Sequence, residues 1–177
     1  MPHVIERATS GRAKCRGCGA TIAAGSQRLG ERLPNSYANA DGLEITYWFH
    51  LACAAYRRPE PLLEALATTP DAIDNRAALE DEARAGVAHP RLSRVGHAER
   101  AASARAACRS CGEKIDKDAW RIALVYYEDG RFSPAGFIHV PCTAGYFETT
   151  AILSRLRHFS PALTEDQFAE IQGLLGG

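Results

Sequence analysis

Two copies of one cysteine–histidine pattern constrain this chain more than any other feature of its sequence. Each copy is a C-x2-C pair followed, after a longer segment, by an H-x2-C pair, and the two copies use all six cysteines. The first set is Cys15, Cys18, His50 and Cys53, and the second is Cys108, Cys111, His139 and Cys142. Three thiolates and one imidazole form a tetrahedral zinc site with no open position for water. The sequence therefore predicts two zinc ions per chain, both structural rather than catalytic.

Disulfides and other zinc architectures fit this arrangement less well. The N-terminal residues lack the long apolar core of a secretion signal, and cysteines that stay inside the cell are more often metal ligands than disulfides. RING-type modules cross-brace two sites, but 54 residues separate Cys53 from Cys108. LIM modules place their second site almost directly after the first. We therefore expect two separate sites.

The sequences around the two ligand sets are also similar, which indicates a duplicated unit. Glycine follows the second cysteine in both copies, as Gly19 and Gly112, where it favours a tight turn. When the copies are aligned on the first cysteine of each set, six of the preceding positions are identical: Glu6/Glu99, Arg7/Arg100, Ala8/Ala101, Ser10/Ser103, Arg12/Arg105 and Ala13/Ala106.

The hydrophobic patterns predict an α+β fold. Residues 44–49 and 121–127 favour strands, and Glu128-Asp-Gly-Arg131 favours a hairpin turn. Helical spacing follows each ligand set: Pro70-Asp71 is expected to open one helix, and Thr164–Gln167 is a capping-box start for another. We therefore expect two small zinc-stabilised fingers, each an antiparallel sheet plus a helix, at residues 1–57 and 96–147. A helical hairpin is expected after each finger, at 58–95 and 148–177.

The charge of the chain is balanced overall but uneven along its length. The 21 Lys and Arg residues equal the 21 Asp and Glu residues, which argues mildly against a nucleic-acid binder. The two regions with cysteines are nevertheless positive, so any affinity for nucleic acid is expected to come from a focused patch. No stretch approaches the roughly 18 apolar residues that span a membrane. We expect an intracellular protein, in the cytoplasm or nucleoid of a bacterium or the nucleus of a eukaryote. The sequence does not decide between a monomer and a homodimer.

Three segments together resemble a known zinc-finger family. They are Glu6-Arg-Ala-Thr-Ser-Gly-Arg-Ala-Lys-Cys-Arg-Gly-Cys18, Ser26-Gln-Arg-Leu29 and Trp48-Phe-His-Leu-Ala-Cys53. The combination is similar to the poly(ADP-ribose) polymerase-type zinc finger, which also occurs in DNA ligase III. The resemblance covers about residues 3–56 and 96–147, and it implies binding to DNA nicks, gaps and ends without dependence on base sequence.

The resemblance also implies which residues contact DNA. Arg12 and Arg105 match the family arginine that holds phosphate, and Arg28 and Arg121 match a second phosphate-contacting arginine. Family fingers also press two side chains onto the base pair exposed at a break.

The first of these stacking positions, five residues before the ligand histidine, is Ile45 in one copy and Pro134 in the other. The second is aromatic in the family, and here the chain departs from the pattern. Tyr37 and Leu43 are the candidates to replace it in the first copy, and Tyr127 and Phe132 in the second.

Three classes of function remain in competition. The first is a non-enzymatic binder of DNA breaks, acting as a damage sensor or as an adaptor for repair proteins. The second is a zinc-structured protein adaptor without DNA binding, which the balanced charge keeps open. An enzyme is disfavoured, because no catalytic base, nucleophile or open metal site is evident outside the two closed sets of ligands. The enzymes of this family carry a separate, large catalytic domain.

Overall fold

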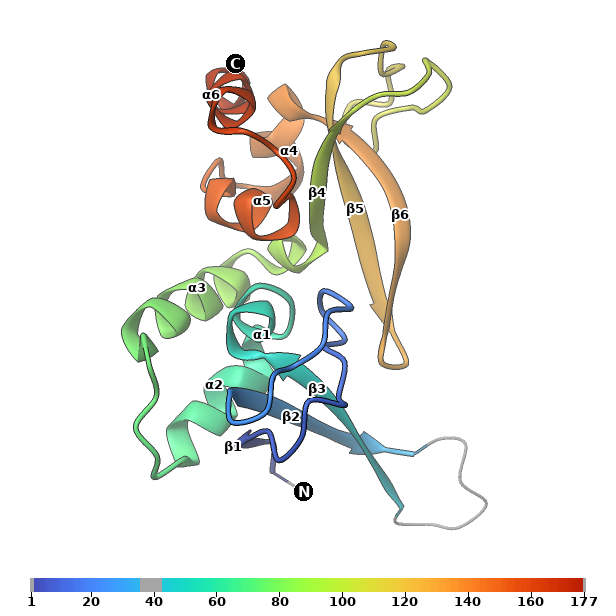
Figure 1. Cartoon of the computed structure of the whole chain (residues 1–177). Helices are drawn as coiled ribbons and strands as arrows, with labels where there is room; N and C mark the ends of the chain where they lie inside the picture. The colour runs from blue at the N-terminus through green and yellow to red at the C-terminus, as the bar shows by residue number, and fades with distance from the viewer. Residues whose placement is uncertain (1, 36–42, 177) are drawn as a thin grey trace. The chain divides into compact units, whose positions relative to one another are not determined.

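The computed structural model describes residues 2–35 and 43–176. Its contacts divide the chain into two units, Met1–Ala88 and His89–Gly177. Each unit contains a three-stranded antiparallel sheet, a Cys/His cluster and several helices (Figure 1). The predicted α+β fold with two zinc-finger sheets is therefore confirmed. Residues 89–95, which were grouped with the first hairpin, belong by their contacts to the second unit.

The first unit is a sheet with helices packed on it. Strands β1 (Val4–Arg7), β2 (Gln27–Pro34) and β3 (Glu44–His50) pair in the order β1-β2-β3. Helices α1 (Leu51–Arg57) and α2 (Pro59–Thr68) contact the sheet, and α3 (Arg76–Ala88) packs against both of them. The core includes Ile22, Leu29, Phe49, Leu62 and Leu66, all at most 1% exposed.

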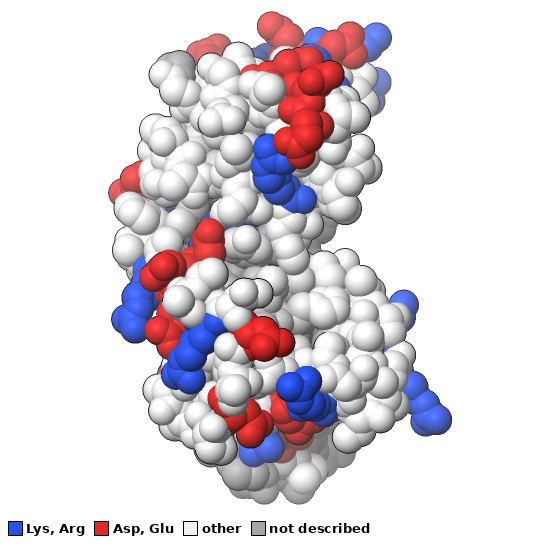
Figure 2. Space-filling view, turned by 60° about the vertical axis from the view of Figure 1, so that its left-hand side comes forward, with Lys and Arg blue, Asp and Glu red and all other residues white. Residues whose placement is uncertain are grey.

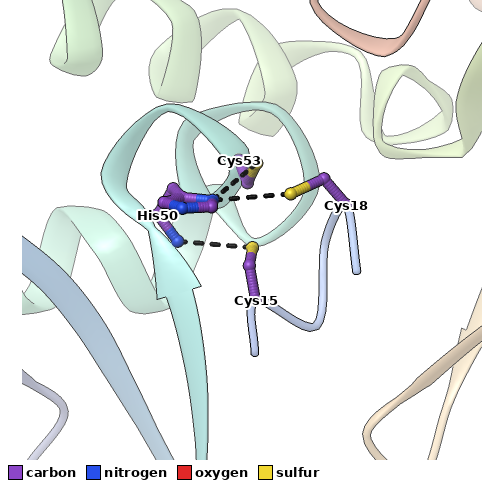
Figure 3. A group of neighbouring side chains, drawn as sticks. All are labelled: Cys15, Cys18, His50 and Cys53. Atoms are coloured by element: carbon purple, nitrogen blue, oxygen red, sulfur yellow. Dashed lines mark hydrogen bonds between the residues drawn. The ribbon is translucent and has the colours of Figure 1, made fainter. Parts of the chain in front are cut away.

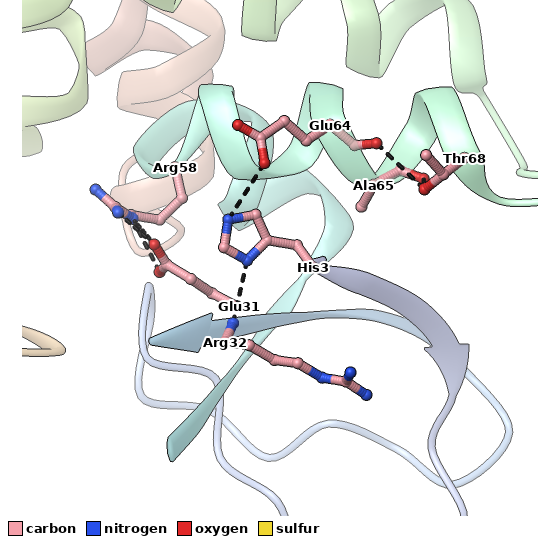
Figure 4. A network of polar contacts seen from close by, with 7 residues as sticks. All are labelled: His3, Glu31, Arg32, Arg58, Glu64, Ala65 and Thr68. Atoms are coloured by element: carbon pink, nitrogen blue, oxygen red, sulfur yellow. Dashed lines mark hydrogen bonds and ion pairs between the residues drawn. The ribbon is translucent and has the colours of Figure 1, made fainter. Parts of the chain in front are cut away.

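Polar contacts attach helix α2 to this sheet (Figure 4). The carboxylate of Glu31 is fully buried and accepts hydrogen bonds of 2.9 and 3.0 Å from Arg58 Nε. His3 Nδ1 accepts a 3.1 Å hydrogen bond from the backbone N–H of Arg32, and His3 Nε2 lies 3.5 Å from Glu64. Strands β1 and β2 are thereby tied to the start and middle of α2.

The second unit repeats the sheet and attaches shorter helices to it. Strands β4 (Val95–Arg100), β5 (Trp120–Glu128) and β6 (Arg131–His139) pair in the order β4-β5-β6. The 3-10 segment η1 (Pro90–Arg94) leads into β4, and η2 (Val140–Cys142) leads into α4 (Thr143–Phe147). Helices α5 (Leu153–Phe159) and α6 (Glu165–Leu175) complete the unit.

Local sequence signals account for the ends of several elements. Asp129 and Gly130 both have positive φ, as a two-residue type I′ turn requires, so the predicted hairpin between β5 and β6 is present. The Thr164 hydroxyl accepts from the backbone of Gln167 and the Gln167 side chain accepts from the backbone of Thr164, which completes the predicted capping box of α6.

Two expectations about local structure were wrong or incomplete. Helix α3 begins at Arg76 and not at Pro70-Asp71, because Asn75 has a left-handed backbone (φ 55°) that cannot continue a helix. Strands β1, β2 and β4 were not predicted. The pairing of β1 with β2 and of β4 with β5 is a tertiary contact that the local hydrophobic pattern does not record. Across the two stretches that the structure describes, no helix combines the length and hydropathy needed to cross a bilayer.

Candidate metal centres and nucleic-acid interface

The first predicted ligand set forms a compact cluster at the end of the first sheet (Figure 3). A tight turn supplies Cys15 and Cys18, while His50 ends strand β3 and Cys53 lies in the first turn of α1. The turn is closed by the N–H of Gly19, which donates to the carbonyl of Cys15 at 2.8 Å. Gly19 has φ +77°, so the glycine after the second cysteine is needed for its backbone conformation.

The second ligand set repeats this geometry closely. Gly112 (φ +80°) donates to the carbonyl of Cys108 at 2.9 Å, and His139 ends strand β6. Cys142 follows in η2 rather than in a full α-helical turn. His139 Nε2 lies 3.1 Å from the carbonyl oxygen of Lys114. This contact holds the proton on Nε2 and leaves Nδ1 free as a ligand atom.

The distances within each cluster fit a zinc ion. In both clusters, two sulfurs lie 3.4 and 3.8 Å from the histidine Nδ1, and all four ligand atoms are within 4.8 Å of one another. With Zn–S near 2.3 Å and Zn–N near 2.0 Å, a tetrahedron places sulfur and nitrogen about 3.5 Å apart. Both sites therefore fit structural zinc with imidazole coordination through Nδ1, and the prediction of two zinc ions per chain is confirmed.

The electrostatics of the thiols also call for a cation. A hydrogen bond from Cys53 lowers the pKa of Cys15 to about 5, while the bond to Cys15 and then burial raise the pKa of Cys53. In the second set, burial opposes ionisation of Cys108, but hydrogen bonds from backbone N–H groups lower its pKa to about 6. Burial raises the pKa of Cys142 to about 12. In each set, ionisation of one thiol therefore makes ionisation of its neighbours less favourable. A divalent cation among the thiols stabilises their thiolate forms together.

A row of side chains crosses each sheet beside its metal centre. Glu6 pairs in register with Arg28, which pairs with His50, and Glu99, Arg121 and His139 repeat this row. Arg28 Nη2 lies 2.6 Å from Glu6 Oε1, and Arg121 Nε lies 2.9 Å from Glu99 Oε1. Each guanidinium also lies 3.6 Å from the centre of an aromatic ring, that of Trp48 or Phe137.

This row shows where the structure places the second pair of predicted phosphate contacts. Arg28 and Arg121 are only 7% and 9% exposed, and each is paired with a carboxylate. A phosphate at either position has to share the guanidinium with that carboxylate, so contact with phosphate stays a prediction. This pairing was not predicted from the sequence, although the repeated identity Glu6/Glu99 was the signal for it.

The first pair of predicted phosphate contacts has a different environment. Arg12 and Arg105 both lie in the segment just before the first cysteine of their set, and both are exposed. In the described part of the chain, neither guanidinium forms an ion pair. The predicted role of Arg12 and Arg105 in holding phosphate stays a prediction.

The predicted stacking residues lie toward the far ends of the two sheets. Leu43 is 55% exposed, just before β3, and Ile45 is half-buried opposite Leu33 of β2. Tyr37 lies outside the described residues. In the second unit, the rings of Tyr127 and Phe132 contact each other at 4.7 Å across the hairpin. Pro134 is exposed, opposite Val125 and next to a β-bulge. Their contact with bases stays a prediction.

Comparison with known proteins identifies relatives of this chain. Residues 6–89 match a family model described as the poly(ADP-ribose) polymerase and DNA-ligase zinc-finger region. A poly [ADP-ribose] polymerase of Drosophila melanogaster is 26% identical over 142 residues, covering 72% of this chain. Poly [ADP-ribose] polymerase 1 of Gallus gallus is 31% identical over 137 residues, covering 69%. Neither unit alone holds so large a share of the chain, so both alignments reach into both units. The chain spans 14% and 13% of the lengths of these two relatives.

Proposed function

Because residues 6–89 match the zinc-finger region of poly(ADP-ribose) polymerases and DNA ligases, we propose that this chain binds DNA at strand breaks. In this proposal both fingers bind nicks, gaps or ends independently of base sequence, and the chain acts without a catalytic step of its own. It serves as a damage sensor or as an adaptor for repair proteins. This match to the family is the observation that carries the proposal.

The arginines before each zinc turn support the proposal. Arg12 and Arg105 occupy equivalent positions, are exposed and form no ion pair among the described residues. A planar guanidinium of this kind suits two parallel hydrogen bonds to phosphate. Phosphate contacts give affinity without sequence information, as a break sensor requires.

Apolar residues at the ends of the sheets supply the preference for a break. Ile45 and Leu43 in the first unit, and Pro134 in the second, present apolar surface that suits the face of an unstacked base pair. Such contact tolerates any base, because every base presents a flat face. An intact duplex hides that face, so binding to a nick or an end is favoured.

The distribution of charge favours local contacts over a broad field. On the face drawn in Figure 2, basic side chains are scattered among acidic ones. The chain has equal numbers of basic and acidic residues. A few placed arginines are therefore expected to carry the phosphate contacts, and the salt dependence is expected to correspond to a small number of contacts.

Titration of the zinc-loaded chain with labelled duplexes tests the proposal. The duplexes are nicked, gapped or blunt-ended, and the intact control is closed by a hairpin at each end. We expect tighter binding to every broken duplex than to the closed one, and weaker binding with a smaller salt slope after Arg12→Ala plus Arg105→Ala. Equal binding to all duplexes contradicts break recognition. If the chain with two zinc ions binds none of these duplexes, a protein adaptor becomes the better-supported function.

A further inference from the structure

Each zinc turn carries a second arginine, directly after its first cysteine. These residues, Arg16 and Arg109, occupy equivalent positions and share one backbone contact. The N–H of Arg16 donates to the carbonyl of Trp48 at 2.9 Å, and the N–H of Arg109 donates to the carbonyl of Phe137 at 2.9 Å. A metal ligand on one side and a strand on the other thus fix the backbone of both residues. Their side chains consequently start from the same place on each finger.

Both side chains are available to a ligand. Arg16 and Arg109 are exposed, and within residues 2–35 and 43–176 neither is paired with a carboxylate. Arg28 and Arg121, in contrast, are buried and bonded to Glu6 and Glu99. A guanidinium that has no carboxylate partner binds phosphate without first losing an ion pair.

The two arginines rest on different surfaces. The guanidinium of Arg16 lies 4.9 Å from the centre of the Tyr47 ring. The equivalent of Tyr47, three residues before the ligand histidine, is Gly136, and Arg109 lies directly over it. A Cβ added to Gly136 would come within 2.6 Å of Arg109 Nε. Arg16 is thus held on a ring, whereas Arg109 lies on bare backbone.

The space beside Arg109 is large enough for a phosphate group. A cavity of about 670 Å³ opens over the second zinc turn, and Arg109 is the one basic residue among the described residues that line it. The remaining lining includes Ala106, Ala107, Phe137 and the two metal ligands Cys108 and Cys111. An anion that enters this cavity therefore has Arg109 as its cationic partner, beside the thiolates of the second zinc site.

We infer that Arg16 and Arg109 are further phosphate-binding residues, one on each zinc turn, in addition to Arg12 and Arg105. The inference rests on the proposed function and names more of its contacts. Arg16 makes the larger contribution of the two, because the Tyr47 ring holds its side chain in place before DNA arrives and less side-chain freedom is lost on binding. The first finger therefore gains more from this position than the second.

The test measures binding of the full zinc-loaded chain to a nicked duplex with hairpin-closed ends, by fluorescence anisotropy at several salt concentrations. Arg16→Ala and Arg109→Ala are compared with Arg16→Lys and Arg109→Lys. Arg84→Ala, which removes an exposed arginine from helix α3, is the matched control. Elemental analysis confirms two zinc ions in each variant. If an Ala variant loses zinc, Arg16→Gln or Arg109→Gln, which keep a long polar side chain, replace it.

Each neutral variant is expected to reduce the slope of log Kd against log salt by about 1. Affinity near physiological salt is expected to fall on the order of tenfold for Arg16→Ala and less for Arg109→Ala. The Lys variants are expected to keep the slope, and Arg84→Ala to leave binding unchanged. Wild-type slopes in both neutral variants, with a reduced slope in Arg12→Ala, overturn this inference and leave the proposed function standing. No binding by the wild-type chain overturns both.

Discussion

The two units of this chain share a zinc frame but differ in what holds their helices to it. In both, the same row of Glu, Arg and His crosses the sheet, with an aromatic ring against the arginine. Three residues beyond that arginine, the units differ. The first has the buried Glu31 bonded to Arg58, and the second has the buried Leu124. Residues near the metal are repeated, whereas this position behind the sheet holds one member of a buried ion pair in the first unit and a leucine in the second.

This difference separates what zinc binding requires from what any small core requires. The ligand geometry depends on a few backbone bonds and on the Glu–Arg pair, and these are the features that both copies have. The interior behind the sheet needs only to be filled and neutralised, and a buried ion pair or a leucine satisfies that need. Perturbations near the metal should therefore act alike in the two units, and perturbations behind the sheet should not.

Loss of zinc is expected to have the largest effect, and to act on one unit at a time. Cys15→Ser should leave one zinc ion per chain and unfold the first unit, while the second stays folded. Zinc-finger peptides gain about 10–16 kcal/mol from the metal, which is as large as the whole stability of a typical domain. Elemental analysis and two-dimensional NMR of the variant, with Cys108→Ser as its mirror, check this. Collapse of both units in either variant would show that they do not fold independently.

The attachment behind the sheet should give the next largest effect. Arg58→Ala leaves the buried carboxylate of Glu31 without its guanidinium, and removal of one partner of a buried pair costs about 3–5 kcal/mol. The double variant Glu31→Leu, Arg58→Leu replaces the ion pair by apolar side chains, as Leu124 does in the second unit. It should destabilise the first unit far less than Arg58→Ala. Leu124→Ala should destabilise the second unit by about 2–5 kcal/mol. Denaturant unfolding of the three variants tests the contrast, and a double variant as unstable as Arg58→Ala would refute it.

The glycines of the zinc turns should give a smaller effect that is equal in both units. Gly19 and Gly112 have φ near +80°, and no atom lies within 4 Å of the position of an added Cβ. Gly19→Ala and Gly112→Ala should thus cost only the strain of a left-handed backbone, about 1–2 kcal/mol each. Thermal unfolding with zinc present measures both. A clear difference between the losses of stability of the two variants would mean that the two turns differ in energy although their geometry is alike.

The Glu99–Arg121 pair should give the smallest effect. Although burial of Glu99 opposes it, hydrogen bonds from His97 and Arg121 hold the pKa of the carboxyl below its ordinary value. A lowered folded-state pKa stabilises the fold above the unfolded-state pKa, and this stability is lost as pH falls through the folded-state pKa. Because the carboxylate is partly exposed, Glu99→Gln should destabilise the second unit by less than about 1 kcal/mol. The deficit should be present above the unfolded-state pKa of a glutamate, about 4.3, and should be lost as pH falls below it. Urea unfolding at several pH values measures it, and a deficit that persists at the acid end would exclude this origin.

The sequence predicted those features that depend on residues close together in the chain. Both cysteine turns with their glycines, the hairpin at Asp129-Gly130 and the capping box at Thr164 are of this kind. The repeat of the whole pattern indicated a metal site more strongly than one copy alone. The fold class and the two zinc sites followed from these local signals.

Features that depend on distant residues could not be predicted in the same way. Arg28 and Glu6 are 22 residues apart, and only the pairing of β1 with β2 brings them together. The family resemblance therefore assigned Arg28 to phosphate, although the sequence alone does not show that Glu6 is its partner. The choice of Nδ1 as ligand atom likewise depends on where the backbone places the imidazole, which the letters H-x2-C do not specify.

The ligand set of the two centres has a consequence for the proposed binding to DNA. Three thiolates outweigh the two positive charges of Zn²⁺, so each Cys₃His centre is an anion of charge −1. Because the chain without metal is formally neutral, loading both sites gives it a net charge of −2. Such a molecule is not drawn to a polyanion from a distance. Its encounter rate with DNA should accordingly lack the steep acceleration at low salt that strongly cationic proteins show, and capture should begin only when an arginine is already near a phosphate.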